Sequence, residues 1–411
     1  MKCRHCHTEC TLSFIDLGSA PPSNAYLTRQ TLIGPEKWFP LKVLVCESCW
    51  LVQAEAYSNA AELFNEEYAY FSSFSEQWLD HSRRYVQEMI QRFSLNISSQ
   101  VVEVASNDGY LLQYFDERNI PCLGIEPTSS TASAARQKGI ETIEEFFTRE
   151  FAASFCDLGK QADLIVANNV LAHVPDINNF VSGFATLLKP DGVATFEFPH
   201  LMQLLDYKQF DTIYHEHFSY LSFTAVETVF KANGLSIFDV QELDTHGGSL
   251  RVLAQRTDTG KKPILKSVFE LISREKAAGM RKKERYQGFQ EQANKIKNDF
   301  LRFLLEAKKN GCKVGGYGAA AKGNTLLNFA GVRPDLLPCI VDRNPNKQGK
   351  FMPGSRIPIV DEEEIRRQKP EYIIILPWNI KDEIMEQLAY VRDWGGKFVT
   401  AVPELRIHSH E

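Results

Sequence analysis

The stretch VVEVASNDGYLLQYF, residues 101–115, constrains the fold of this chain more than any other part of its sequence. Its apolar start is typical of a buried strand, Ser106 to Gly109 form a tight polar turn, and Tyr110 opens a predicted helix. The run CLGIEPT follows and places Glu126 at the end of a second strand. This order is typical of a nucleotide-type cofactor site, where the carboxylate accepts hydrogen bonds from a ribose.

The pattern is not the dinucleotide fingerprint, because no G-x-G-x-x-G is present. It resembles motif I of the class I S-adenosylmethionine methyltransferases, because Glu103 stands at the end of the first strand and a small-residue turn follows. It departs from that motif at Ala105, where the first glycine is usual. Any strand–helix–strand unit with a polar turn is the alternative. On the methyltransferase interpretation, the residues expected against the cofactor are Glu103, Ser106, Asn107, Gly109, Tyr110, Leu111, Glu126, Pro127, Asn168 and Asn169.

Residues 101–255 alternate between predicted strands and helices, which favours a doubly wound, mostly parallel sheet with ligands at the carboxyl ends of its strands. One strand, ADLIVA, is followed by Asn168, Asn169 and then His173. These polar groups are expected to face the cofactor crevice. Capping of the next helix by Asp176 and Asn178 is the alternative explanation.

Two cysteine pairs near the start predict a metal site. Cys3 and Cys6 form one C-x-x-C knuckle, and Cys46 and Cys49 form another. Four thiolates complete the tetrahedral set of a structural zinc, which leaves no open position for chemistry. Substitute ligands crowd the first knuckle: His5, His7 and Cys10. Free cysteines or a redox pair are the alternative, but we expect a small, β-rich, zinc-stapled domain.

The densest group of reactive side chains is YHEHFSY, which contains Tyr214, His215, Glu216 and His217. A histidine is the natural base at neutral pH, and a neighbouring carboxylate fixes its tautomer. A polar loop with a buried, satisfied histidine is the alternative. An aromatic connector with Tyr68, Tyr70 and Phe71 precedes the cofactor motif; it is either core or a cap over the active site.

Two glycine-rich turns are further candidates. Thr245 to Ser249, with His246 and Gly247, is either a hairpin or a loop that touches a ligand. KVGGYGAAAKGNTLLNF, after a charged helical segment over residues 260–310, begins a second α/β unit. There Tyr317 and Lys322 suit a phosphate or diphosphate, so we expect a nucleotide handle; a purely structural turn is the alternative.

Length and charge set the remaining bounds. At 411 residues the chain exceeds one ordinary core, and we expect a zinc-binding domain over 1–57, a methyltransferase domain over 58–258, and a helical linker with a Rossmann-like domain over 259–411. The net charge of −6 gives no general attraction to nucleic acid or to membranes. No apolar run is long enough to span a bilayer, and no signal peptide is evident. The nine cysteines, an odd number, argue against a framework of disulfides. We expect a cytoplasmic monomer.

The motifs in this order, CxxC…CxxC, EVASNDGYLL, GIEP, NNVLAHVPD, YHEHFSYLS, HGGSLRV and GYGAAAKGN, resemble the nucleotide-sugar C-methyltransferases over essentially the whole chain. The resemblance implies an α/β protein with a zinc-binding N-terminal domain, a central class I methyltransferase sheet, and a C-terminal Rossmann-like domain that helps to hold the nucleotide diphosphate. It implies S-adenosylmethionine-dependent methylation of a nucleotide-linked 4-keto-deoxysugar. An O- or N-methyltransferase, or a non-catalytic scaffold, is the alternative.

The resemblance also implies roles for single residues. His217 would be the base that forms an enolate, oriented or assisted by Glu216, and Tyr214 and His217 could exchange roles. Tyr68 and Tyr214 would contact the sugar or the enolate, with His173 nearby, and no catalytic metal is needed. The residues expected to bind the substrate are Tyr70, His246, Gly247, Tyr317 and Lys322.

Overall fold

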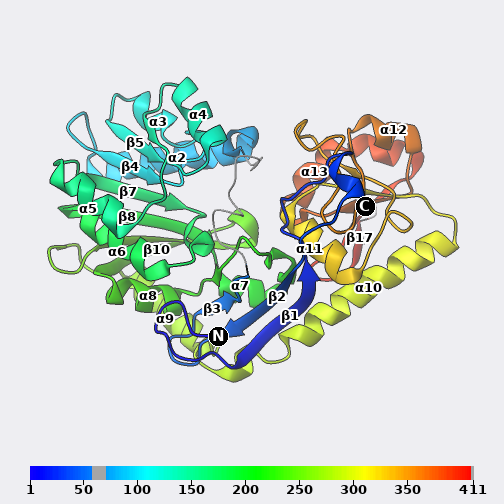
Figure 1. The fold of residues 1–411 in the computed structure, drawn as a ribbon, viewed down its shortest axis with the longest axis horizontal. Coiled ribbons are helices and arrows are strands. Elements are labelled where there is room, and N and C mark those ends of the chain that lie inside the picture. Colours follow the sequence, from blue (N-terminus) through cyan, green and yellow to red (C-terminus); the bar gives the residue numbers. More distant parts are fainter. Residues whose placement is uncertain (58–70, 409–411) are drawn as a thin grey trace.

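A computed structural model describes residues 1–57 and 71–408. Three β-sheets organise the chain. A seven-stranded and a six-stranded sheet, each with its helices, form two lobes, and strands β1 and β2 lie between and below them (Figure 1). In the described part of the chain, no helix combines the length and apolar character needed to cross a membrane.

The central sheet has the strand order β10-β11-β8-β7-β4-β5-β6. Its strands are β4 (Val101–Val104), β5 (Cys122–Ile125), β6 (Thr142–Ile143), β7 (Ala162–Asn168), β8 (Leu188–Pro199), β10 (Leu235–Leu243) and β11 (Ser249–Arg256). Strands β4 to β8 run parallel, and β11 is antiparallel to both of its neighbours. This is the predicted doubly wound sheet with the class I methyltransferase fold, and the polar ends of β4 and β7 meet at one edge.

Helices cover both faces of this sheet, because its middle strands are apolar on both sides. Along β7, Ile165 and Ala167 join the core beneath α5, α6 and α8, while Leu164 and Val166 join the core beneath α2. The helices of this lobe are α2 (Glu76–Phe93), α3 (Gln113–Asp116), α4 (Ser129–Gln137), α5 (Arg149–Asp157), α6 (Ile177–Leu187), α7 (Leu201–Asp206), α8 (Phe223–Ala232) and α9 (Lys266–Ala277).

The N-terminal sheet is antiparallel, in the order β1-β2-β3-β9. Its strands are β1 (Leu12–Ala20), β2 (Phe39–Val45), β3 (Val52–Ala54) and β9 (Ser219–Tyr220). The last of these, β9, is part of the YHEHFSY segment. It joins the sheet beside β3, where Val52 pairs with Tyr220 and Gln53 with Ser219. The N-terminal sheet is therefore completed by the segment that carries the candidate base.

The C-terminal sheet follows the order β14-β13-β12-β15-β16-β17, parallel except for β17. Its strands are β12 (Val314–Tyr317), β13 (Ile340–Val341), β14 (Ile359–Val360), β15 (Tyr372–Ile375), β16 (Lys397–Thr400) and β17 (Arg406–His408). Its helices are α10 (Phe289–Lys309), α11 (Ala321–Ala330), α12 (Glu363–Gln368) and α13 (Lys381–Gln387). The charged segment predicted to be helical contains α9 and α10.

Short 3-10 turns complete the described elements. They are η1 (Thr31–Ile33), η2 (Ser72–Phe74), η3 (Leu171–His173), η4 (Phe210–Thr212), η5 (Thr245–Gly247), η6 (Lys283–Arg285), η7 (Trp378–Ile380) and η8 (Ala389–Trp394). Three of them, η3, η4 and η5, carry or flank candidate site residues.

Candidate active site and metal centre

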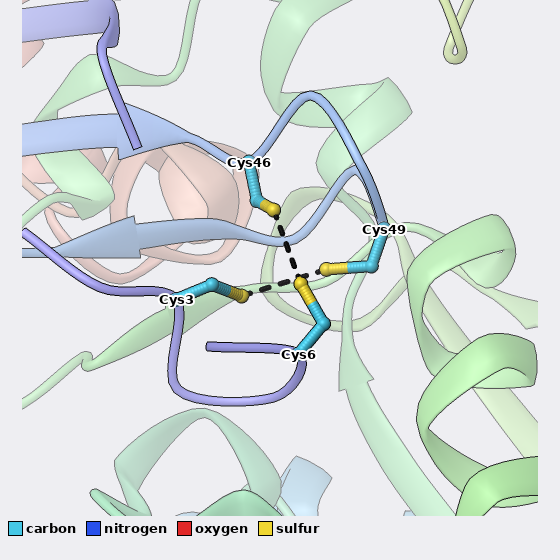
Figure 2. Close-up of side chains that lie close together, drawn as sticks. All are labelled: Cys3, Cys6, Cys46 and Cys49. Carbon is cyan, nitrogen blue, oxygen red and sulfur yellow. Dashed lines mark hydrogen bonds between the residues drawn. The ribbon is translucent and has the colours of Figure 1, made fainter. Parts of the chain in front are cut away.

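The two C-x-x-C knuckles converge on one point (Figure 2). The Sγ atoms of Cys3, Cys6, Cys46 and Cys49 lie within 4.8 Å of one another, and the Cys3–Cys49 and Cys6–Cys46 pairs are 3.5 Å apart. Thiolates about 2.3 Å from a tetrahedral zinc stand at about this mutual spacing. The four cysteines therefore fit a structural zinc and leave it no open coordination position.

Two of the substitute ligands of the first knuckle, His5 and Cys10, lie away from the metal set. The Nδ1 atom of His5 lies 2.7 Å from Oδ1 of Asn178 at the start of α6. Cys10 is buried but lies outside the four-cysteine cluster. The knuckle is therefore docked on α6 by His5, while the metal set consists of the four predicted cysteines.

The turn after β4 adopts the left-handed conformations that a tight cofactor loop requires. Ala105, Asn107 and Gly109 have φ angles of 58°, 50° and 75°. The Glu126 carboxylate accepts hydrogen bonds from the backbone N–H groups of Asn107 and Thr128, both at 2.9 Å. The acidic residue that ends β5 thus braces the turn, which brings the two halves of the predicted motif together.

Buried polar atoms gather at this edge of the sheet. Ser106 Oγ, Asn168 Oδ1 and Asn169 Oδ1 are buried and have no hydrogen-bond partner in the described part of the chain. Burial also raises the pKa of Glu103 well above its ordinary value, although the Tyr110 hydroxyl lowers it. Unpaired buried polar atoms cost about 1–3 kcal/mol each, so this edge fits a polar ligand such as the predicted cofactor.

The remaining predicted cofactor residues lie close by in the chain. Tyr110 and Leu111 are buried in the core beneath α2, and Pro127 is half-buried in the loop after β5. Leu111 is therefore primarily a core residue. A ligand at this edge would contact the residues beside Leu111.

His217 is buried with its tautomer fixed. Its Nδ1 lies 2.9 Å from the carbonyl oxygen of Thr212, and its ring packs on Tyr214 and His173 at centroid distances of 4.0 and 4.7 Å. Nδ1 of His173 lies 2.8 Å from the carbonyl oxygen of Glu216. A carbonyl only accepts, so both imidazoles carry their proton on Nδ1 when neutral and hold a lone pair on Nε2. Burial lowers the pKa of His217 well below its ordinary value, and lowers that of His173 to about 4.

The neighbours of His217 in sequence are tied to the N-terminal domain. Oε1 of Glu216 accepts hydrogen bonds from the backbone N and from Nδ2 of Asn24, at 3.3 and 3.2 Å. Nε2 of His215 donates toward the carbonyl oxygens of Phe39 and Pro40, each at 3.2 Å. We expected Glu216 to orient the His217 ring, but the Thr212 carbonyl makes that contact, because the Glu216 side chain faces Asn24.

The glycine-rich loop at η5 joins the two lobes. Nε2 of His246 lies 3.4 Å from Nδ2 of Asn169, and its carbonyl oxygen lies 3.4 Å from Nζ of Lys322. A Cβ atom on Gly247 would lie 2.7 Å from the Trp378 ring, so only glycine allows this approach. Burial lowers the pKa of His246 to about 4.

Lys322 enters the same site from the C-terminal lobe. Its Nζ donates to Oδ1 of Asn379 at 2.9 Å and lies 4.4 Å above the ring of Trp378, whose Nε1 donates to Oδ2 of Asp211 at 2.7 Å. Burial lowers the pKa of Lys322 to about 8 and raises that of Asp211 to about 6. The site therefore contains a cation held by aromatic and amide groups.

The glycine-rich turn after β12 packs closely against Pro377 at Gly318. A Cβ atom on Gly318, where φ is 87°, would lie 2.4 Å from Pro377. Ala319 donates its N–H to Asp342 at 2.8 Å. Tyr317 lies in the core of the C-terminal lobe, and its hydroxyl is bonded to Gln387. Of the two predicted handle residues, the structure brings Lys322 and not Tyr317 to the histidines.

Tyr68 and Tyr70 lie outside the described residues. Three residues that contact the candidate site were not anticipated: Asn24, Thr212 and Asp211. From the sequence, the PPSNAYL run around Asn24 predicts a loop and no site residue. Thr212 contributes a backbone carbonyl, which no side-chain motif reveals, and Asp211 lies in no recognisable pattern.

Comparisons with known proteins give a consistent result. Family models match residues 3–64 as a zinc binding domain, 78–240 as a methyltransferase domain, and 244–403 as a C-methyltransferase C-terminal domain. The C-methyltransferase NovU of Streptomyces niveus is 33% identical over 410 residues, which cover 100% of this chain and 97% of NovU.

Two further matches cover only part of the chain. A ubiquinone biosynthesis O-methyltransferase of Rhodopseudomonas palustris (strain TIE-1) is 23% identical over 148 residues, 31% of this chain and 58% of that protein. The crystal structure of magnesium protoporphyrin IX methyltransferase from Synechocystis PCC 6803 with bound SAM also matches. The match covers 44% of this chain and 79% of the chain in that structure, with 16% identity and a TM-score of 0.34.

Proposed function

The chain belongs to the C-methyltransferase family, and from that membership we propose that it methylates a ring carbon of a nucleotide-linked 4-keto-deoxysugar through an enolate. It is a methyltransferase that uses S-adenosylmethionine and holds a structural zinc. The three domains proposed for these tasks have the boundaries 1–57, 58–258 and 259–411. A cytoplasmic location belongs to the same proposal, because cysteine pairs that bind a metal instead of forming disulfides are typical of reducing compartments.

The cofactor is assigned to the carboxyl edge of the central sheet. We assign Glu126 to the ribose, and Ser106, Asn168 and Asn169 offer polar atoms that have no hydrogen-bond partner among the described residues. The cofactor supplies an electrophilic methyl group on a sulfonium, and the protein supplies alignment of that group with the attacking carbon.

The observation that carries this proposal is the pair of carbonyl-bound imidazoles. His217 and His173 both keep a proton on Nδ1, and the rings lie 4.7 Å apart. A neutral imidazole with its lone pair on Nε2 can remove the proton next to a ketone. We assign His217 as that base, with His173 beside it and Tyr214 stacked on its ring to receive the sugar.

The enolate oxygen needs positive charge or hydrogen-bond donors nearby. Lys322 is a buried cation linked to this site, because its Nζ reaches the carbonyl of His246 and lies over the ring of Trp378. We assign Lys322 to the diphosphate or to the sugar oxygen, and His246 and Gly247 to the loop that closes over the substrate.

Binding and isotope measurements test the proposal. We expect S-adenosylhomocysteine and thymidine diphosphate to bind at separate sites in isothermal titration. We expect the methylated carbon to lose its deuterium when a deuterated 4-keto-sugar nucleotide is turned over. Cofactor binding without nucleotide binding, or methyl transfer without deuterium loss, would indicate an O- or N-methyltransferase instead.

A further inference from the structure

One loop of the N-terminal domain contacts both the C-terminal lobe and the segment that carries the candidate base. Residues 21–27 follow β1 and lie against the C-terminal lobe, where the dark blue chain meets the orange helices and loops (Figure 1). The same residues reach back to Glu216 in the segment that carries the candidate base. We call residues 21–27 the strap.

We propose that Asn24 is a positioning residue of the active site, which holds the Glu216 carboxylate in place while Tyr26 fixes the strap to the C-terminal lobe. The role assigned to Asn24 in turnover rests on the proposed function, in which His217 is the base. The mechanical part of the proposal does not, because it concerns the contacts of the protein alone.

The strap contacts the Glu216 carboxylate through two hydrogen bonds from Asn24. The backbone N–H and the side-chain amide of Asn24 both donate to Oε1. Glu216 is 2% exposed, and its other oxygen, Oε2, is buried with no hydrogen-bond partner in the described residues. Burying a carboxylate is costly unless donors compensate, so the two Asn24 donors keep this group in the site and leave Oε2 for a substrate hydroxyl.

A movement of Glu216 would reach both histidines. Its carbonyl oxygen accepts from Nδ1 of His173 at 2.8 Å, and His217 follows it directly in the chain. The amide of His217 bonds to the carbonyl of Tyr214 at 3.0 Å, and that of Phe218 to the carbonyl of Ala172 at 2.8 Å. Asn24 therefore acts on the base through the backbone of Glu216.

The far end of the strap is anchored on the C-terminal lobe. The Tyr26 hydroxyl donates to the carbonyl of Ala319 at 2.6 Å, in the turn that leads to α11. Leu27 and Phe351 exchange two backbone hydrogen bonds, at 3.0 and 2.8 Å. Gly354 leaves room for the strap, since a Cβ atom there would lie 2.9 Å from Cδ of Pro21. Both ends of the strap are thus held by specific contacts.

Four variants of the full-length, zinc-loaded protein test this. Asn24→Ala removes one donor, Asn24→Asp sets a second carboxylate against Glu216, and Tyr26→Phe removes only the anchor hydroxyl. The double variant Asn24→Asp, Glu216→Gln reverses donor and acceptor and restores a hydrogen bond. Asn346→Ala, at an exposed site of the C-terminal lobe, is the matched control.

The first readout is hydrogen–deuterium exchange of peptides spanning 213–218, without ligands. We expect several-fold faster exchange there in Asn24→Ala, a larger increase in Asn24→Asp, and recovery in the double variant, with unchanged zinc content. The second readout is kinetic: kcat should fall about tenfold or more in Asn24→Ala, while KM for S-adenosylmethionine stays the same.

The two readouts separate the two hypotheses. Wild-type exchange in both Asn24 single variants would overturn the positioning role, whatever the activity. The expected exchange pattern with no turnover of any keto-sugar by the wild type would support the strap and reject the proposed function. Wild-type kcat in Asn24→Asp would overturn the role of Asn24 in catalysis.

Discussion

The Nδ1 atom of His217 lies 2.9 Å from the carbonyl oxygen of Thr212. This contact comes from the same lobe as the candidate base, whereas the contacts of His215 and Glu216 come from the N-terminal domain. Three successive residues are therefore fixed by different partners. The contact with Thr212 leaves Nε2 of His217 as its only basic atom, which makes the assignment of the base testable.

Replacing His217 by alanine should slow proton removal strongly and leave cofactor binding intact. General bases contribute about 10²–10⁴-fold to a rate, so we expect kcat to fall within that range. Isothermal titration with S-adenosylhomocysteine and deuterium release from the substrate measure the two effects. His408→Ala, on β17, is the control. Normal turnover by His217→Ala would transfer the role of base to Tyr214.

The burial of this site predicts an unusual pH profile. Burial lowers the pKa of His217 well below its ordinary value of about 6.5, so its imidazole stays neutral as the pH falls through that value. We expect kcat/KM to be flat through pH 6.5 and to fall only at lower pH, once the ring is protonated. Initial rates checked against circular dichroism at each pH measure this. An acid limb centred near 6.5 would contradict the buried, neutral base.

Ala105 offers a test of the cofactor turn. Its φ of 58° is a left-handed conformation, which costs about 1–2 kcal/mol for a residue with a Cβ atom. Ala105→Gly relieves this strain but gains chain entropy in the unfolded state, so we expect a net stabilisation of about 0.5–1 kcal/mol in the free energy of unfolding.

Ala134→Gly is the matched control for this change, because Ala134 lies within α4, where glycine should destabilise by about 1 kcal/mol. Urea titrations of both variants give the comparison. Destabilisation of equal size in the two variants would show that Ala105 is not strained.

The sequence predicted what depends on local pattern. The continuous apolar run around Leu164 and Ile165 predicted the buried strand, and the small-residue turn before Gly109 predicted the tight loop after β4. Pairings between distant segments carry no local signal. Tyr220 pairs in the N-terminal sheet with Val52, which is far away in the sequence and is an ordinary apolar residue.

The candidate site was predictable in its residue types and not in its contacts. The density of histidine and carboxylate around His217 identified the segment, since such side chains are costly to bury without a purpose. The partner of Glu216 was not foreseeable, because Asn24 is brought to it by a loop that follows another domain's strand. The glycine-rich turn shows a limit of sequence patterns, because a glycine that packs on Pro377, as Gly318 does, has the same sequence signature as one that faces a phosphate.

The metal centre predicts that substitutions of Cys46 and of Cys10 have different effects on zinc binding. Cys46→Ser should lose zinc and much stability, because structural zinc sites contribute about 10–16 kcal/mol to folding in small domains. Cys10→Ala should keep one zinc per chain, because Cys10 lies outside the cluster. Metal analysis by mass spectrometry and thermal melts with and without a chelator measure both variants. Zinc loss from Cys10→Ala would enlarge the ligand set.

The last prediction concerns the charge of Lys322. Burial lowers its pKa to about 8, and the lysine is charged only below that value. If Lys322 holds the diphosphate, thymidine diphosphate should bind progressively more weakly as the pH rises through 8, and Lys322→Met should weaken binding at pH 7 about tenfold or more while S-adenosylhomocysteine binds as before.

The matched control is Lys309→Met, at the exposed end of α10. Isothermal titration from pH 6.5 to 9.5 on the three proteins separates the effects. The pH dependence should disappear in Lys322→Met and persist in Lys309→Met, since only the first removes the titrating group. Equal affinity of the wild type at both ends of this range would mean that the Lys322 ammonium serves the loop at His246, to whose carbonyl it donates, and not the nucleotide.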